Sequence, residues 1–119
     1  MTDRLFSTIW ADALTATDPE AFASDWATSS AFLDPEEPDQ EIDAGLFAQL
    51  QTLWGVAHWP FRELLQRMEL SQTGCATRFC IPLRTVQDWA AEKRTPPAYV
   101  RLLMAEAVGL ATVRDYGQV

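Results

Sequence analysis

Apolar residues recur every three or four positions through most of the chain, a spacing that predicts helices rather than strands. We therefore expect an all-α protein. The first such stretch runs from Thr2 to about Thr15 and predicts an amphipathic helix. Its apolar positions are Leu5, Phe6, Ile9, Trp10 and Leu14.

A second helix is predicted to begin at the sequence Asp18-Pro19-Glu20. This tripeptide combines an N-cap carboxylate, a proline suited to the first helical position and an acid near the positive end of the helix dipole. Phe22 and Trp26 lie one turn apart on the helix, and we interpret this aromatic pair as core rather than as a ligand-binding box. The following stretch, AFLDPEEPDQE, has two prolines and five acids and indicates a solvated loop or linker.

A third helix is predicted from Glu41, with Gly45 and Gly55 weakening it without breaking the pattern. Its apolar positions are Ile42, Leu46, Phe47, Leu50, Leu53, Trp54 and Ala57. Pro60 then opens a fourth helix, FRELLQRMEL, which we expect to bury Phe61, Leu64, Leu65 and Met68 and to expose Arg62, Glu63 and Arg67.

A closing helix is predicted from Ala98 to Ala111, and its apolar residues cover more than one face. This surplus leaves two interpretations open, because either a second copy of the chain or the N-terminal helices could cover it. The tail TVRDYGQV predicts no element.

The stretch from Ser71 to Pro97 reads as two short helices joined by a tight turn. Ser71 is an N-cap signal, and Pro82 cannot continue the first helix but suits the first turn of a new one. We expect the first helix to bury Cys75, Ala76 and Phe79. We expect the second to bury Val86 and Trp89 and to expose Leu83, Arg84, Thr85, Gln87 and Asp88. A short helix anchored by Trp, with Arg, Thr and Gln exposed, has the chemistry needed to read base edges in a major groove.

The segment LSQTGCATRFCIPLRTVQDWAAEKRTPPAYVRLL resembles the Cro/repressor-type, or Xre-like, helix-turn-helix family. The resemblance covers roughly residues 59–110. It rests on Leu-Ser-Gln at the start of one helix, Thr-Val-x-x-Trp in the next, and a basic segment that ends in proline before the closing helix. It implies a C-terminal helix-turn-helix bundle that binds double-stranded DNA, commonly as a homodimer. Cys80 stands where the family usually carries a glycine with positive φ, so we expect the turn either to be strained or to take another geometry. Gly74 and Ala90 also depart from the family pattern, which has Ala and Glu at these places.

From position and from the resemblance, we assign roles to eight residues. Gln72 and Thr73 would meet phosphate at a helix N-terminus. Arg84, Thr85 and Gln87 would reach bases. Lys93 and Arg94 would hold the flanking backbone, and Arg78 would contact either phosphate or an acid on the protein surface.

Charge divides the chain into two parts. Residues 1–58 hold one basic and eleven acidic residues, a net charge of −10, whereas residues 59–119 hold eight basic and six acidic residues, a net charge of +2. The overall charge of −8 by itself argues against a nucleic-acid binder, but the asymmetry indicates two surfaces with two kinds of partner. We predict an acidic helical region over 1–58, for oligomerisation or partner binding, and a DNA-binding domain over 59–119.

Composition excludes several other classes. Two cysteines and one histidine give no set of zinc ligands, and we expect Cys75 and Cys80 to be buried, reduced thiols. His58 is expected to be a packed or capping residue, and because no nucleophile or carboxylate pair has a suitable spacing, we expect no enzyme and no cofactor. No apolar run approaches a membrane span and the N-terminus is too polar for a secretion signal, so we expect a cytoplasmic protein.

Two functional hypotheses follow. In the first, the protein is a small bacterial, phage or mobile-element transcriptional regulator that binds a specific DNA sequence, including the possibility of an autoregulating, antitoxin-like protein. In the second, the acidic half is an inhibitor of a nucleic-acid-binding defence enzyme, comparable to an anti-CRISPR protein, and carries a helix-turn-helix domain. We favour the first.

Overall fold

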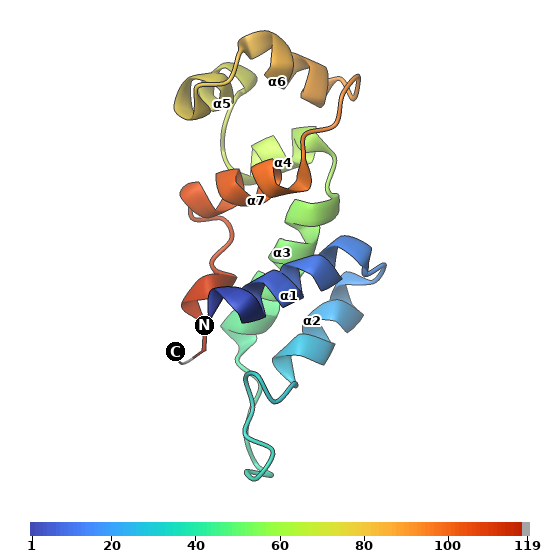
Figure 1. Cartoon of the computed structure of the whole chain (residues 1–119), viewed down its shortest axis with the longest axis vertical. Helices are drawn as coiled ribbons and strands as arrows, with labels where there is room; N and C mark the ends of the chain where they lie inside the picture. The colour runs from blue at the N-terminus through green and yellow to red at the C-terminus, as the bar shows by residue number, and fades with distance from the viewer. Residues whose placement is uncertain (118–119) are drawn as a thin grey trace. The chain divides into compact units, whose positions relative to one another are not determined.

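The computed structural model describes residues 1–117, and over these residues every regular element is helical, which confirms the predicted all-α class (Figure 1). The elements, in chain order, are α1 (Asp3–Thr15), α2 (Pro19–Ala27), α3 (Ala44–His58), α4 (Phe61–Arg67), α5 (Gln72–Phe79), α6 (Leu83–Ala90), α7 (Ala98–Ala107) and the short 3-10 helix η1 (Val113–Asp115). Among the described residues, no helix combines the length and the apolar character that crossing a membrane requires.

The chain divides into two compact units. One unit comprises residues 1–55 together with the chain from residue 111 onward, and the other comprises Val56–Leu110. The division lies three residues before the predicted boundary after residue 58. The segment from residue 111, which the sequence analysis assigned to the second domain, belongs to the first unit.

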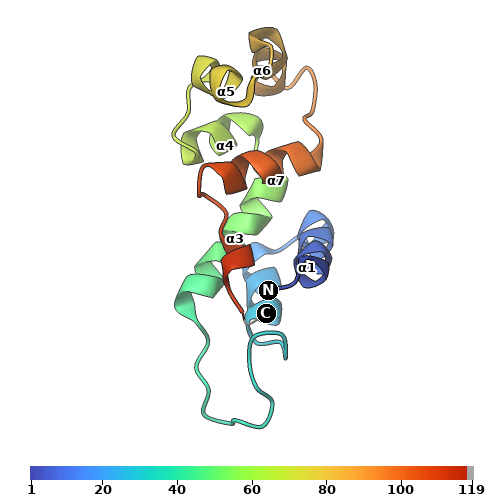
Figure 2. The same cartoon turned by 60° about the vertical axis from the view of Figure 1, so that its left-hand side comes forward.

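Local capping signals set the ends of the first two helices. Thr2 accepts a hydrogen bond from the backbone N–H of Leu5 at 3.1 Å, and Asp18 accepts one from Glu20 at 3.0 Å, with Pro19 in the first turn of α2. The two helices lie side by side in both views (Figures 1 and 2). Phe6, Ile9, Ala13, Phe22, Ala23 and Ala27 are the buried residues of this pair, whereas Leu14, predicted to face the core, is exposed.

Helix α3 begins at Ala44 and not at the predicted Glu41, because Asp43 caps it. The Asp43 carboxylate accepts a hydrogen bond from the Leu46 N–H at 3.0 Å, so the chain before it is outside the helix. Ile42, predicted to be on the apolar face, is 43% exposed. The stretch before it is a loop, as predicted, in which the Gln40 side chain accepts a hydrogen bond from the Asp34 N–H at 2.6 Å.

The tail forms an element that the sequence did not predict. Val113, in η1, is almost completely buried. The N-terminal ammonium group of Met1 donates hydrogen bonds to the carbonyls of Arg114 and Tyr116, at 3.3 and 3.2 Å. Arg114 pairs with Asp3 at 3.2 Å, and its guanidinium lies 4.0 Å from the centre of the Phe6 ring. These contacts hold the two ends of the first unit together.

The tail also explains a glycine in α3. A Cβ atom at Gly45 would lie 2.8 Å from the phenolic oxygen of Tyr116, too close for any ordinary contact. Gly45, which the sequence presented as a weak point of the helix, therefore permits the tail to approach.

The second unit contains α4 to α7 in two layers, with α5 and α6 in one and α4 and α7 in the other (Figures 1 and 2). Helix α7 ends at Ala107 and not at the predicted Ala111. Gly109, at φ 77°, allows the Leu110 N–H to turn back to the carbonyl of Ala105 at 2.9 Å, a glycine-terminated C-cap. Helix α4 also ends earlier than predicted, at Arg67, and Glu69 follows with φ 59°.

Candidate nucleic-acid interface

Helices α5 and α6 are both short, and the three residues Cys80, Ile81 and Pro82 connect them. The Ser71 hydroxyl accepts a hydrogen bond from the Gly74 N–H at 2.9 Å, which confirms the predicted N-cap. Cys80 ends α5 in the left-handed conformation, with φ 56° and ψ 42°. Of the two alternatives, the structure has the strained one, a positive-φ turn with a cysteine where glycine would be unstrained.

The cap at Ser71 also accounts for Gly74. A Cβ atom at this position would lie 3.0 Å from the Ser71 hydroxyl oxygen that caps the helix. Glycine costs roughly 1 kcal/mol of helix propensity relative to alanine. At Gly74 the Ser71 hydroxyl can approach the backbone N–H without meeting a Cβ atom, and its hydrogen bond offsets part of the propensity cost.

Helix α6 has a buried face and an exposed face. Val86 and Trp89 are buried, and the Trp89 ring meets Phe61 of α4 edge to face, with 5.4 Å between ring centres. Arg62 of α4 donates from Nε to the carbonyl of Ala90 at 3.0 Å. These contacts attach α6 to the rest of the unit along one side and at its C-terminal end.

The eight predicted site residues lie on α5, on α6 and in the connection that follows α6. Gln72, Thr73 and Arg78 are on α5, Arg84, Thr85 and Gln87 are on α6, and Lys93 and Arg94 are in the connection to α7. Six of them are exposed, and Gln72 and Thr85 are half-buried. Of the other α6 residues predicted to be exposed, Leu83 is exposed and Asp88 is half-buried.

Asp88 brings two of these arginines together. Its carboxylate lies 3.5 Å from Nε of Arg84 and 4.0 Å from Nε of Arg94. The Arg84 side chain is 82% exposed, so the pair adds little stability, but the shared carboxylate places both guanidinium groups beside α6. The four-residue spacing of Arg84 and Asp88 could have predicted the first contact; the second depends on the path of the loop.

Arg78 is attached to the fold rather than to an acid. It donates a hydrogen bond to the carbonyl of Ala107 at 3.1 Å, at the C-terminal end of α7, where a cation is favourable. The sequence analysis expected either phosphate or a surface acid as its partner, and the observed partner is a main-chain carbonyl.

The observed exposure corrects two sequence-based predictions, those for Cys80 and His58. Cys80 is exposed and not buried, whereas Cys75 is buried, and burial raises the pKa of the Cys75 thiol. Both cysteines are unbridged, as expected. His58, predicted to be either packed or capping, is the last residue of α3 and is exposed, which contradicts the packed alternative only.

Arg101 of α7, which the sequence analysis treated only as a positive charge, is a buried residue. Its side chain is 7% exposed, and burial lowers its pKa below the ordinary value. No local pattern distinguishes Arg101 from the exposed arginines, because its environment depends on the packing of α7 against the end of α3.

Over residues 1–117 no group of three or more His, Cys, Asp or Glu side chains is arranged to hold a metal ion. Neither a family model, nor a curated protein, nor a solved structure matches this chain.

Proposed function

We propose that α5 and α6 act as a helix-turn-helix of the Cro/repressor type and that the protein is a sequence-specific DNA-binding regulator of transcription. The observation that supports this most is the division of α6, which is anchored by Val86 and Trp89 while Arg84 and Gln87 project into solvent. A helix held in this way presents its polar face to a major groove without losing its attachment.

In this proposal the exposed residues of α6 read bases. Arg84 would pair with guanine, Gln87 with adenine, and the Thr85 methyl would contact thymine. Arg84 must leave Asp88 to do so. This exchange has a small cost, since their ion pair is exposed.

The remaining site residues would contact the DNA backbone. The first N–H groups of α5, at Gln72 and Thr73, lie beyond the reach of the Ser71 cap and would meet a phosphate. Lys93 and Arg94 would contact the flanking phosphates from the connection after α6. Arg78 would do so from its place beside the end of α7.

We further propose that the protein binds DNA as a homodimer. An apolar groove of about 450 Å³ lies between the α5–α6 turn and α7, lined by residues that include Ile81, Val100 and Met104. Leu103, which also lines the groove, is 57% exposed, and Tyr99 on the same helix α7 is 64% exposed. Such a surface suits a second copy, which would present two recognition helices to successive major grooves.

The charge distribution is compatible with DNA binding by the second unit. Residues 56–110 carry seven basic and five acidic residues, a net charge of +2, although the whole chain carries −8. Phosphate contacts would supply affinity that falls as salt rises.

A gel-shift assay with the DNA immediately upstream of the gene tests the proposal at two salt concentrations. We expect a discrete shift that resists nonspecific competitor and weakens steeply at the higher concentration. Arg84→Ala and Gln87→Ala should each reduce specific affinity by about 1–3 kcal/mol and leave the protein folded.

Arg67→Ala is the matched control, because Arg67 is an exposed arginine of α4 that pairs with Glu63 at 3.2 Å and has no proposed role in binding. Its shift should equal that of the wild type. Equal binding by the wild type, Arg84→Ala and Gln87→Ala would refute the proposed recognition helix.

A second candidate function rests on the acidic loop before α3. Asp34, Glu36, Glu37 and Asp39 are all exposed there, in a loop closed by the Asp34–Gln40 hydrogen bond. This surface would suit a basic, nucleic-acid-binding protein partner, as in an inhibitor that imitates nucleic acid. A complex with such a partner should survive Arg84→Ala and be lost when the four acids are neutralised; a complex that survives their neutralisation would exclude this function.

A further inference from the structure

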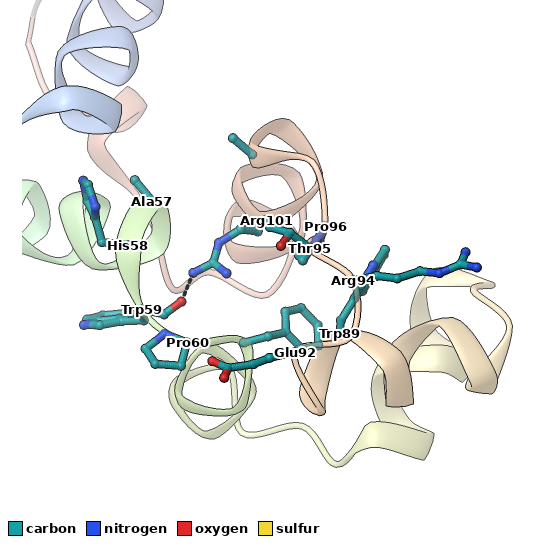
Figure 3. Close-up of a pocket in the computed structure, with 12 residues that line it drawn as sticks. Ala57, His58, Trp59, Pro60, Trp89, Glu92, Arg94, Thr95, Pro96 and Arg101 are labelled. Atoms are coloured by element: carbon teal, nitrogen blue, oxygen red, sulfur yellow. Dashed lines mark hydrogen bonds between the residues drawn. The ribbon is translucent and has the colours of Figure 1, made fainter.

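A hollow of about 440 Å³ lies in the second unit, between the end of α3, α6 and the start of α7 (Figure 3). Phe61, Trp89 and Pro96 give it aromatic and apolar walls, and Trp59 faces Arg101 with its main-chain carbonyl. Its volume is within the range of sites that bind small organic molecules. The proposed DNA-reading residues Arg84 and Gln87 do not line it.

Arg101 lines this hollow with a charge that no carboxylate neutralises. Nε donates to the carbonyl of Val56 at 2.7 Å and Nη2 donates to the carbonyl of Trp59, toward which the side chain is directed in Figure 3. A guanidinium group has five N–H donors, and in residues 1–117 the structure supplies acceptors for these two nitrogens only. No acid of the described chain forms an ion pair with Arg101.

A cation without a counter-ion is costly where it is shielded from water, and the two carbonyls compensate it in part. No buried side-chain nitrogen of the described residues lacks a hydrogen-bond partner, so the remaining N–H groups of Arg101 reach the solvent in the hollow. Arginine stays protonated even when burial lowers its pKa, so the group cannot avoid the cost by losing its proton. An anion in the hollow would complete both the hydrogen bonding and the charge.

We infer that this hollow is a binding site for a small aromatic monocarboxylate. The guanidinium fork of Arg101 would bind the carboxylate, and the walls formed by Phe61 and Trp89 would contact the ring. The exposed charges of Arg94 and Glu92 on the lining have opposite signs and cancel, so the net charge of the lining is the single positive charge of Arg101. A monoanion therefore fits better than a dianion. The inference concerns the second unit alone and does not depend on the proposed DNA binding.

The pair 2-naphthoate and 2-naphthamide tests the inference, because the two molecules have nearly the same shape and differ in charge. NMR titration of the full chain would follow the indole N–H signals of the five tryptophans and the Nε–H signal of Arg101. We expect 2-naphthoate to shift the signals of Trp89 and Arg101, with a Kd about tenfold lower than that of 2-naphthamide. Trp10, Trp26 and Trp54, which belong to the first unit, serve as internal controls and should not shift.

Two variants separate binding from folding. Arg101→Met removes the charge and should abolish the preference for naphthoate, but this residue also contacts the end of α3, and the variant could fail to fold. Glu92→Gln changes only an exposed side chain on the lining, and it should tighten naphthoate binding about two- to threefold without affecting naphthamide. Equal affinity for the two probes, equal shifts in all five tryptophans, no shift at all, or a Glu92→Gln variant that binds naphthoate no tighter would each overturn the inference.

Discussion

Cys80 shows how a single residue can hold an element in place at a cost. It ends α5 at φ 56°, a conformation that costs an L-residue with a Cβ atom roughly 1–2 kcal/mol. Its side chain is exposed and forms no disulfide, so side-chain packing does not offset this backbone strain. We attribute the strain to the tight turn between α5 and α6, which requires the left-handed conformation at this position.

Replacing this cysteine should relieve the strain. We expect Cys80→Gly to raise the free energy of unfolding by about 0.5–1 kcal/mol, the net of relieved strain and the extra freedom of glycine in the unfolded chain. Denaturant unfolding would measure it, with Cys80→Ala as a control that keeps the Cβ atom and should be close to neutral. A Cys80→Gly protein less stable than Cys80→Ala would contradict this account of the turn.

Cys75, in contrast, is buried, with its sulfur 3.9 Å from that of Met104. Burial raises the pKa of its thiol above the ordinary value of 9.0, so the folded chain keeps the proton when the unfolded chain has begun to lose it. The unfolded state then binds fewer protons than the folded one, and stability falls as pH rises.

The expected pH dependence follows from that sign. Well below pH 9.0 the contribution of Cys75 is fully present, and above that pH the free energy of unfolding should fall by up to about 1.4 kcal/mol per pH unit. Unfolding curves from pH 7 to 10 for the wild type and Cys75→Ala would isolate this group, with Cys80→Ala retaining the wild-type slope. Parallel curves for the wild type and Cys75→Ala would show that the Cys75 thiol does not contribute.

At the scale of elements, the sequence predicted what local signals determine. Ser71 and Asp18-Pro19 marked helix starts correctly, and the apolar spacing of Val86 and Trp89 identified the buried face of α6. Asp43 has the same capping chemistry, but Glu41 and Ile42 extended the helical pattern past it.

What the sequence missed depends on contacts between distant residues. The tail is ordered by Met1 and by the packing of Arg114 on Phe6, more than a hundred residues away. Arg101 is buried because it meets carbonyls at the end of α3, and Arg78 meets the end of α7. No periodicity within a segment encodes such pairings, so the candidate site was predicted as a set of residues but not as a set of contacts.

The two faces of α6 should respond differently to truncation. Trp89→Ala removes a buried ring that packs on Phe61 and should cost about 3–5 kcal/mol. Gln87→Ala, on the exposed face, should change stability by less than about 0.5 kcal/mol. Thermal and denaturant unfolding of both variants would measure the contrast, and comparable losses would mean that α6 is not held as described.

At the scale of the whole molecule, the protein combines a strongly acidic unit with a weakly basic one. Residues 1–55 and the chain from residue 111 hold two basic and twelve acidic residues, a net charge of −10, whereas residues 56–110 carry +2. A negative field of this size opposes DNA at long range and is screened by salt.

Neutralising the acidic loop should therefore strengthen DNA binding if the second unit binds DNA. We expect Asp34→Asn, Glu36→Gln, Glu37→Gln and Asp39→Asn together to raise affinity several-fold at 50 mM salt, with the difference shrinking by 300 mM. Fluorescence anisotropy at the two salt concentrations would measure it. Weaker DNA binding by the neutralised protein would show that the loop takes part in the complex.

The most direct test of the central proposal, that α6 reads DNA sequence, is selection of binding sites from a randomised duplex library. Wild-type protein should enrich one motif, with two copies in inverted orientation if the protein binds as a dimer, and Arg84→Ala should lose the preference for guanine at one position of each copy. Enrichment of no motif by the folded wild type, or of the same motif by Arg84→Ala, would contradict the proposal.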